Sequence, residues 1–315
     1  NADLAEAFAS LVVSDDRIFL SQLGRRSFWS RDKGIKAAEG SFYKELFKNG
    51  ATIYPRPFWF VQVKASPLGF NPSLPPLETA ERAKEQAKDA YKGLVLKGNV
   101  ESRFLYATLL STDLLPFGHL GYRLVVLPIE LRGTGYNLVT AEEAHRRGFF
   151  HLAKWLEKVQ EEWEHRRGEK AEGIDALGWL DYQRKATSQD PQAKYRVIYP
   201  SSGTYLCAYV VEDQPIALDI GEQNVPVRGF VVDHVTYHFE TNREDEAHYL
   251  ATVLNAPIVD KLLKPMQARG LWGPRHIHKK ALDLPIPQFD PPEGAHLKLA
   301  ELGRACTQKV ADWVR

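Results

Sequence analysis

The sequence predicts an α+β protein made of two mixed units, each with a small β-sheet, joined or flanked by long amphipathic helices. Runs rich in β-branched and aromatic residues alternate with helical patterns along the chain. One order of motifs occurs twice, and each copy ends in apolar residues at helical spacing. The 315 residues suffice for two domains of ordinary size. We expect units at residues 1–165 and 193–315, each ending in a long helix, and a linker at 166–192.

The first unit is expected to alternate between helices and strands. Residues 3–20 have a helical pattern. Two prolines interrupt a β-rich run over residues 51–64, so the strand is expected over residues 58–63. Residues 78–92 are rich in Ala, Lys and Glu and precede Gly93, which predicts an exposed helix with a glycine cap.

The same unit is expected to end in a long helix. Residues 100–116 predict a further helix, and residues 122–129 predict a strand. Thr140 and Glu143 have the spacing of a capping box, which predicts the start of this long helix. Five apolar residues lie on one face of the long helix that follows: Leu152, Trp155, Leu156, Val159 and Trp163.

The second unit is expected to be mostly β-structure before its final helix. Residues 166–192 are polar and glycine-rich, as is typical of a linker. Residues 195–211 predict a β-hairpin with its turn at 200–203. Further strands are expected at 227–233 and 236–240.

An internal repeat supports the two-unit organisation. Residues 104–110 and 248–254 share a pattern that predicts the same helix twice. Each is followed by Leu-Pro-Ile, at 127–129 or 284–286, and then by a long helix that begins near a His-Leu pair. We expect the two long helices to pack against each other. The apolar stripe of the second is Leu299, Leu302, Cys306, Val310 and Trp313.

Composition excludes several classes of protein. The net charge of +1 gives no argument for nucleic-acid binding from composition alone. Cys207 and Cys306 are far apart, which predicts neither a disulfide framework nor a zinc site. Without an apolar run of about 20 residues or a secretory signal, we expect a cytoplasmic protein with no membrane contact. The chain begins at Asn1 and its single methionine is Met266, so we expect a piece of a longer protein.

A basic segment at residues 264–280 is the clearest candidate for a binding site. It contains five Lys or Arg residues and two His residues and no acidic residue, so it could neutralise phosphates. Its glycines allow close backbone approach, and Trp272 could supply a stacking face. An ordinary basic loop with Trp272 in the core is the alternative. The candidate contact residues are Lys264, Arg269, Gly270, Trp272, Arg275, His276, His278, Lys279 and Lys280.

Three further groups are weaker candidates. Arg56 stands beside aromatic residues that could stack bases, although alternating aromatics in a strand are more often core. The second group, in the expected hairpin turn, could contact phosphates or base edges, or could be an ordinary turn. The third, in the expected linker, could read bases by hydrogen bonds. The second and third groups are Ser201, Ser202 and Thr204, and Arg184, Lys185 and Gln189.

Motifs for catalysis and metal binding are missing from the sequence. Gly133-Thr134-Gly135 lacks the third glycine of a nucleotide-binding fingerprint. His276 and His278 have no Cys, Asp or Glu at ligand spacing, so no metal site is predicted. Asp213, Asp219 and Glu222 are not followed by the Glu-x-Lys of a metal-dependent nuclease. We therefore predict no catalytic residue and no cofactor within these residues.

Residues 261–289, KLLKPMQARGLWGPRHIHKKALDLPIPQF, resemble the C-terminal region of N6-adenine DNA methyltransferases that carry their own recognition domain. The stretches at 41–61 and 194–211 are similar to the same family, so the resemblance covers most of the chain. The loop, the LPIP motif and the long helix are also similar to each half of the type I restriction specificity subunit. Those subunits contain two target recognition domains separated by helices.

The resemblance implies a sequence-specific DNA recognition module of a type II restriction-modification protein, not a complete enzyme. The family's Asn or Asp, Pro, Pro, aromatic tetrad is not met, because Asp290-Pro291-Pro292 is followed by Glu293. The implied partners are double-stranded DNA and an upstream methyltransferase domain in the same chain, which would use S-adenosylmethionine. The alternative is a protein-interaction scaffold that docks methyltransferase or nuclease subunits.

Overall fold

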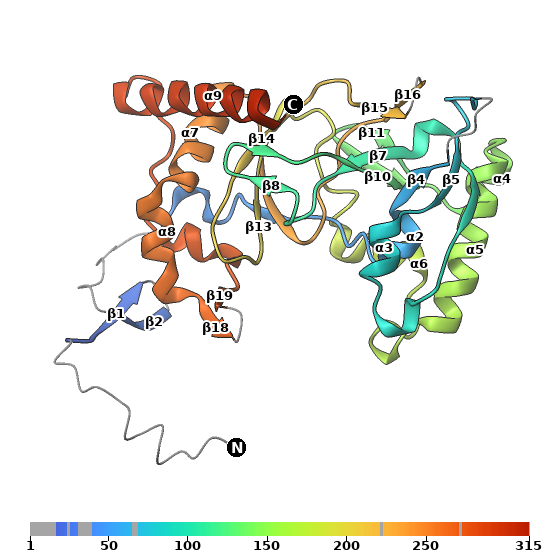
Figure 1. Ribbon diagram of the computed structural model, residues 1–315, viewed down its shortest axis with the longest axis horizontal. Coiled ribbons are helices and arrows are strands. Elements are labelled where there is room, and N and C mark those ends of the chain that lie inside the picture. Colours follow the sequence, from blue (N-terminus) through green and yellow to red (C-terminus); the bar gives the residue numbers. More distant parts are fainter. Residues whose placement is uncertain are drawn as a thin grey trace, which may run out of the picture.

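The computed structural model describes residues 17–23, 26–30, 40–64, 69–220, 223–270 and 273–314. It confirms the α+β class, because helices and several small, separate sheets alternate along the chain. Figure 1 shows helices α2 to α6 at one end of the molecule and α7 to α9 at the other, with strands between them. We call these ends the α5 lobe (chiefly residues 51–192) and the α7 lobe (chiefly residues 40–49 and 195–314).

The α5 lobe is built around its longest helix. Its helices are α2 (Arg56–Trp59), α3 (Glu81–Glu85), α4 (Ala141–Arg146), α5 (Phe150–Arg166) and α6 (Ala176–Leu180). The predicted apolar face of α5 is confirmed, because all five of its residues are buried. The Thr140 hydroxyl accepts a hydrogen bond of 3.1 Å from the backbone N–H of Glu143, which confirms a cap at this residue. The capped helix is the short α4, however, and not the long helix α5 as predicted, because α4 ends at Arg146 and α5 begins at Phe150. The Trp155 indole donates to the carbonyl of Phe58 at 3.1 Å, which fixes α5 against α2.

The strands of this lobe form small antiparallel sheets. One sheet has the order β4 (Val61–Val63), β5 (Pro76–Thr79), β6 (Lys97–Asn99). The others are the pairs β7 (Leu105–Thr108) with β10 (Arg123–Val126), β8 (Leu114–Leu115) with β9 (Gly118–His119), and β11 (Ile129–Arg132) with β12 (Gly135–Leu138). The strand predicted at 122–129 is therefore largely confirmed.

Three predictions for the chain before residue 117 are wrong in part. Residues 105–108, predicted as helix, form the strand β7; all four are buried, and such a short, mostly apolar run has no periodicity that distinguishes a strand from a helix. Phe58 and Trp59, predicted as strand, lie in α2. The helix predicted at 78–92 covers only Glu81–Glu85, because Thr79 pairs with Val61 in the sheet and Tyr91 turns into the core.

The N-terminal prediction is wrong where it can be compared with the structure. Phe19 and Leu20, predicted as helix, begin the strand β1 (Phe19–Leu23), which pairs with β2 (Arg26–Ser30). Residues 3–16 of the predicted helix lie outside the described residues.

The α7 lobe combines a four-stranded sheet with three helices. The sheet has the order β14 (Tyr209–Glu212), β13 (Tyr195–Pro200), β17 (Thr236–Thr241), β3 (Lys48–Asn49). The pair β13–β14 confirms the predicted hairpin, but its loop covers residues 201–208 and not the tight turn predicted at 200–203, because β14 begins only at Tyr209. The strand β17 confirms the strand predicted at 236–240. Residues 227–233 form only isolated bridges at Phe230 and Asp233, so the strand predicted there is wrong.

The helices of this lobe are α7 (Glu244–Asn255), α8 (Pro257–Leu263) and α9 (Gly294–Val314). Three acidic residues in the first turn of α7 complement the helix dipole, and Pro257 opens α8 at a position where its missing N–H costs nothing. Two short hairpins complete the fold: β15 (Ala217–Ile220) with β16 (Gln223–Pro226), and β18 (Ala268–Gly270) with β19 (Gly273–Arg275). Within the described residues, no helix combines the length and the apolar character needed to cross a bilayer.

Residues 166–192, predicted as a linker, are a packed part of the α5 lobe. Ala171, Ala176, Leu180 and Ala186 are buried in the same core as the apolar face of α5. Of its glycines, Gly168 and Gly173 lie in turns, and Gly178 lies within α6. The division of the chain into domains stays a prediction.

Of the three structural similarities expected from the internal repeat, one is present and two are not. Residues 105–108 form a strand whereas residues 248–254 lie in α7, so the first pair of motifs does not share a structure. Figure 1 shows α5 and α9 at opposite ends of the molecule, so the two long helices do not pack together. The Leu-Pro-Ile motifs do share a backbone bond, because Ile129 and Ile286 each donate to the leucine two residues earlier at 2.9 Å.

Small residues, not the predicted apolar stripe, make the buried face of α9. Leu302 is 49% exposed and Trp313 is 79% exposed, while Ala300 and Gly303 are buried against α7. A Cβ on Gly303 would lie 2.5 Å from the Thr252 hydroxyl oxygen, so the backbones of the two helices approach too closely for a larger side chain. Thr252 also donates to the carbonyl of Leu299 at 2.9 Å.

Candidate nucleic-acid interface

Two predicted segments that are distant in the sequence meet at the end of β13. The backbone N–H of His278 donates to the carbonyl of Ser201 at 2.8 Å. The N–H of His276 lies 3.5 Å from the Ser202 hydroxyl oxygen. The described part of the basic segment therefore lies along the hairpin turn, and both belong to one surface, which we call the turn surface (residues 201–205, 264–270 and 273–280).

Further contacts join the other end of the turn to the start of the basic segment. The Gln267 amide donates to the carbonyl of Gly203 at 3.1 Å. The Lys264 ammonium donates to the carbonyl of Thr204 and lies 4.3 Å from the centre of the Tyr205 ring. Thr204 and Tyr205 are exposed, so this edge presents a hydroxyl, an aromatic ring and a cation to solvent.

Two histidines at the centre of the turn surface have an unusual backbone. His276 and His278 have φ of 62° and 43°, in the left-handed region that non-glycine residues rarely adopt. Ile277 between them is fully buried, and the Tyr199 hydroxyl donates to the carbonyl of His278 at 3.0 Å. These contacts hold the strained backbone, and the two exposed imidazoles lie nearly parallel with ring centres 5.7 Å apart. Strain of this kind is concentrated at functional sites.

Acidic residues from outside the segment neutralise part of its charge. Lys264 pairs with Asp260 at 3.2 Å. Lys279 donates to the carbonyl of Lys44 at 2.7 Å and lies 4.0 Å from the Glu45 carboxylate. The folded surface is therefore less positively charged than the sequence of residues 264–280 alone suggests.

Other predicted residues of the segment are placed only in part. Arg275 is exposed on β19, and Lys280 is half-buried. Arg269 and Gly270 lie in β18, but the side chain of Arg269 is outside the described part of the chain, as is the whole of Trp272. Among the described residues, no three His, Cys, Asp or Glu side chains are grouped as metal ligands.

The hairpin β1–β2 is a candidate that sequence reasoning missed. Leu20 and Trp29 face each other across the two strands, and their exposed fractions are 63% and 66%. The strand β2 lies against the 3-10 turn Lys264–Met266, which is part of the turn surface. The apolar residues of the hairpin stand in adjacent pairs, Phe19-Leu20 and Phe28-Trp29, and show no strand periodicity, and the basic residues between and after them are typical of an exposed loop. An exposed aromatic residue beside cations is the arrangement that stacks on bases.

The remaining candidates lie away from the turn surface. Arg56 is on α2 in the α5 lobe, where its guanidinium donates to the Gln86 side chain at 2.5 Å (Figure 1). Arg184 is exposed in the 3-10 turn Tyr182–Arg184 of the predicted linker, and the Lys185 ammonium lies 6.0 Å from the Tyr182 ring centre. The prediction that Gln189 reads a base is wrong for this conformation. Gln189 is buried, and its amide bonds both the N–H and the carbonyl of Val232, at 2.8 and 2.9 Å.

Comparison of the sequence with known protein families and with curated proteins gave no match.

Proposed function

We propose that this chain binds duplex DNA through the turn surface, as the target recognition module of an N6-adenine DNA methyltransferase. The observation that carries the proposal is the union of two distant candidate segments on one exposed face. Ser201 and Ser202 are bonded to His278 and His276, and Lys264 to Thr204. The methyltransferase part of the proposal comes from the resemblance of residues 261–289 to that family.

The chemistry of the turn surface suits a nucleic acid. Arg275 is exposed and always charged, so it can pair with a phosphate and release counterions. The parallel imidazoles of His276 and His278 and the ring of Tyr205 supply flat faces and hydrogen-bonding edges. The hydroxyl of Thr204 can accept or donate at a phosphate or a base edge. In this proposal the turn surface positions the duplex while an upstream domain holds S-adenosylmethionine and transfers the methyl group.

A salt titration of duplex binding tests the proposal. The variant Arg275→Ala should weaken binding and reduce the slope of log affinity against log salt by about one, because one phosphate contact is lost. Arg146→Ala is the matched control, since Arg146 is exposed on α4 in the other lobe. Fluorescence anisotropy with a labelled duplex measures both. Binding that does not respond to salt, or equal behaviour of the two variants, contradicts the proposal.

A protein-interaction scaffold is the second candidate, and one observation favours it. The outer face of α9 exposes Leu302 and Trp313, which are the kind of residues that anchor protein interfaces. Charge reversal of Lys279 and Lys280 separates the two functions. DNA affinity falls if the turn surface binds a duplex, whereas a scaffold that docks through α9 keeps its full affinity for a methyltransferase or nuclease subunit.

A further inference from the structure

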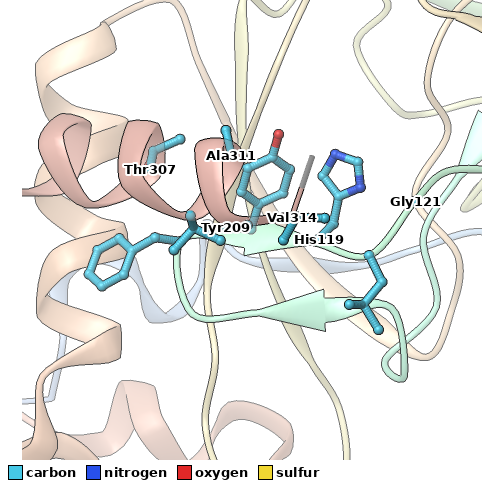
Figure 2. Close-up of a pocket in the computed structure, with 10 residues that line it drawn as sticks. His119, Gly121, Tyr209, Thr307, Ala311 and Val314 are labelled. Carbon is cyan, nitrogen blue, oxygen red and sulfur yellow. The ribbon is translucent and has the colours of Figure 1, made fainter.

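A cavity of about 280 Å³ lies where the C-terminal end of α9 meets the hairpin β8–β9 and the start of β14. Figure 2 shows Tyr209 and His119 side by side next to Thr307, Ala311 and Val314 of the helix. In Figure 1 this end of α9 lies on the opposite side of the α7 lobe from the hairpin β18–β19, so the cavity is separate from the turn surface. Its volume is close to the lower end of the range for small-molecule sites, about 300 Å³.

The walls of the cavity are preformed by contacts between distant segments. Gly118 packs directly on the Val310 side chain, because a Cβ at this position would lie 2.4 Å from the Val310 Cγ1. Phe117 donates its N–H to the carbonyl of Ala208 at 2.9 Å, which fixes the hairpin to the strand that carries Tyr209. A ligand would therefore enter a site that needs little rearrangement.

The residues that line the cavity are mainly apolar and aromatic, and two of their polar atoms have no hydrogen-bond partner among the described residues. Phe117, Leu120, Val310 and Val314 provide apolar surface. The imidazole of His119 is tilted against two tyrosine rings, with its centre 5.1 Å from that of Tyr209 and 4.3 Å from that of Tyr122. His119 Nδ1 and the Thr307 hydroxyl are buried and have no hydrogen-bond partner among the described residues. Buried polar atoms nearly always have a hydrogen-bond partner, so these two atoms are available for hydrogen bonds to a ligand.

The uncharged lining of the cavity disfavours charged ligands. Burial lowers the pKa of His119, the nearby Asp113 opposing this more weakly, so its imidazole is neutral at neutral pH. No Lys, Arg, Asp or Glu is among the ten residues that line the cavity. A charged ligand would lose its hydration without gaining an opposite charge. A flat, neutral ligand would gain both stacking on the aromatic rings and the two unused hydrogen-bonding atoms.

We propose that this cavity binds a neutral, planar heteroaromatic ligand of nucleobase size, stacked beside Tyr209 and His119 and hydrogen-bonded to His119 Nδ1 and the Thr307 hydroxyl. The proposal does not rest on the proposed DNA-binding function, because none of the lining residues belongs to the turn surface.

Adenine is the probe for the first test, followed by NMR of the labelled protein. Adenine should shift the backbone signals of Gly118 and Gly121, while the non-planar cyclohexanecarboxamide and the charged benzoate should not. Ala311→Trp fills the cavity and should abolish the shifts. Ala305→Trp is the matched control, because Ala305 is exposed on the same helix and does not line the cavity. Binding of all three compounds alike, or no binding of adenine, overturns the proposal.

Thr307→Val provides a second test, which applies even if Ala311→Trp does not fold. This change keeps the shape of the side chain and removes a hydroxyl that has no partner, so folding should be unaffected. Adenine affinity should fall by about three- to tenfold, the effect of one hydrogen bond. Unchanged affinity in this variant overturns the assigned contact.

A second arm identifies the source of the ligand. A duplex with one unpaired adenine is compared with the same duplex fully paired. Preference for the unpaired adenine that is lost in Ala311→Trp assigns the site to a base within nucleic acid. Binding of adenine without such a preference assigns it to a free small molecule. Either result supports a heteroaromatic ligand. If neither free adenine nor the duplex with an unpaired adenine binds, the proposal is contradicted.

Discussion

Burial decides what individual polar residues of this chain can do. Gln189 has the side chain of a base-reading residue, yet its amide is bonded to the backbone of Val232 and Lys185. His238 on β17 is 1% exposed and lies near Arg196 and Lys48. Burial, together with these two cations, lowers the pKa of His238 to about 3. Neither residue can be distinguished in the sequence from an exposed counterpart, because its burial depends on segments elsewhere in the chain.

The pKa of His238 predicts acid sensitivity. An unfolded histidine titrates near pH 6.5, so the unfolded chain takes up the proton first as the pH falls. The stability that neutral His238 contributes is therefore present above about pH 6.5 and is lost progressively between about pH 6.5 and about pH 3.

Replacement of His238 by Gln tests this expectation. The variant should lose less free energy of unfolding between pH 7 and pH 5 than the wild type, by up to about 1.4 kcal/mol per pH unit. Urea unfolding at a series of pH values measures the difference. His151→Gln is the matched control, since it removes an exposed histidine from α5. Parallel pH profiles of wild type and His238→Gln would show that the buried imidazole is not the source.

At the scale of elements, the contact between α7 and α9 depends on the small residues Ala300 and Gly303. Apolar residues at helical spacing predicted a different face for α9, with Leu302 and Trp313 inward. The face that is buried is the one that lets the two backbones approach, because a Cβ on Gly303 would lie 2.6 Å from the carbonyl oxygen of His248. Apolar periodicity does not register such a close approach between helices.

Gly303→Ala should destabilise the protein by about 1 to 3 kcal/mol, the usual cost of overpacking. This is opposite to the gain of about 1 kcal/mol that Gly to Ala gives in an open helix. Gly294→Ala, at the start of the same helix with no atom within 4 Å of its Cβ, should be neutral or slightly stabilising. Thermal unfolding compares the two variants. A stability gain in Gly303→Ala would contradict the packing described for α9.

At the scale of the whole molecule, a third apolar cluster connects the two lobes. Ala107 and Leu109 of the α5 lobe pack with Ile198 and Val211 of the α7 lobe. Phe230 lies in the same cluster, and its backbone forms a bridge with Ala107. Two larger cores lie beside it: one is built mainly from residues 51–186 with Val225 and Val231, and the other mainly from residues 197–300 with Tyr43 and Phe47. We expect the two lobes to unfold together because they share this cluster.

Phe230→Ala tests the coupling between the lobes. Loss of a buried phenylalanine should cost about 3 to 5 kcal/mol. Hydrogen exchange should then become faster in both α5 and α9, which belong to different lobes (Figure 1). Leu180→Ala, within the α5 core alone, is the control. Faster exchange in only one lobe after Phe230→Ala would mean that the lobes unfold independently.

The sequence by itself determined the α+β class, the buried face of α5, the cap at Thr140 and the hairpin β13–β14. These features depend on periodicity and on hydrogen bonds between residues close in the chain, which local patterns record. Only the tertiary structure decided that residues 105–108 are a strand, that residues 166–192 are packed, and that the hairpin turn meets the basic segment. Each of these depends on a partner far away in the sequence, whose position no local pattern contains.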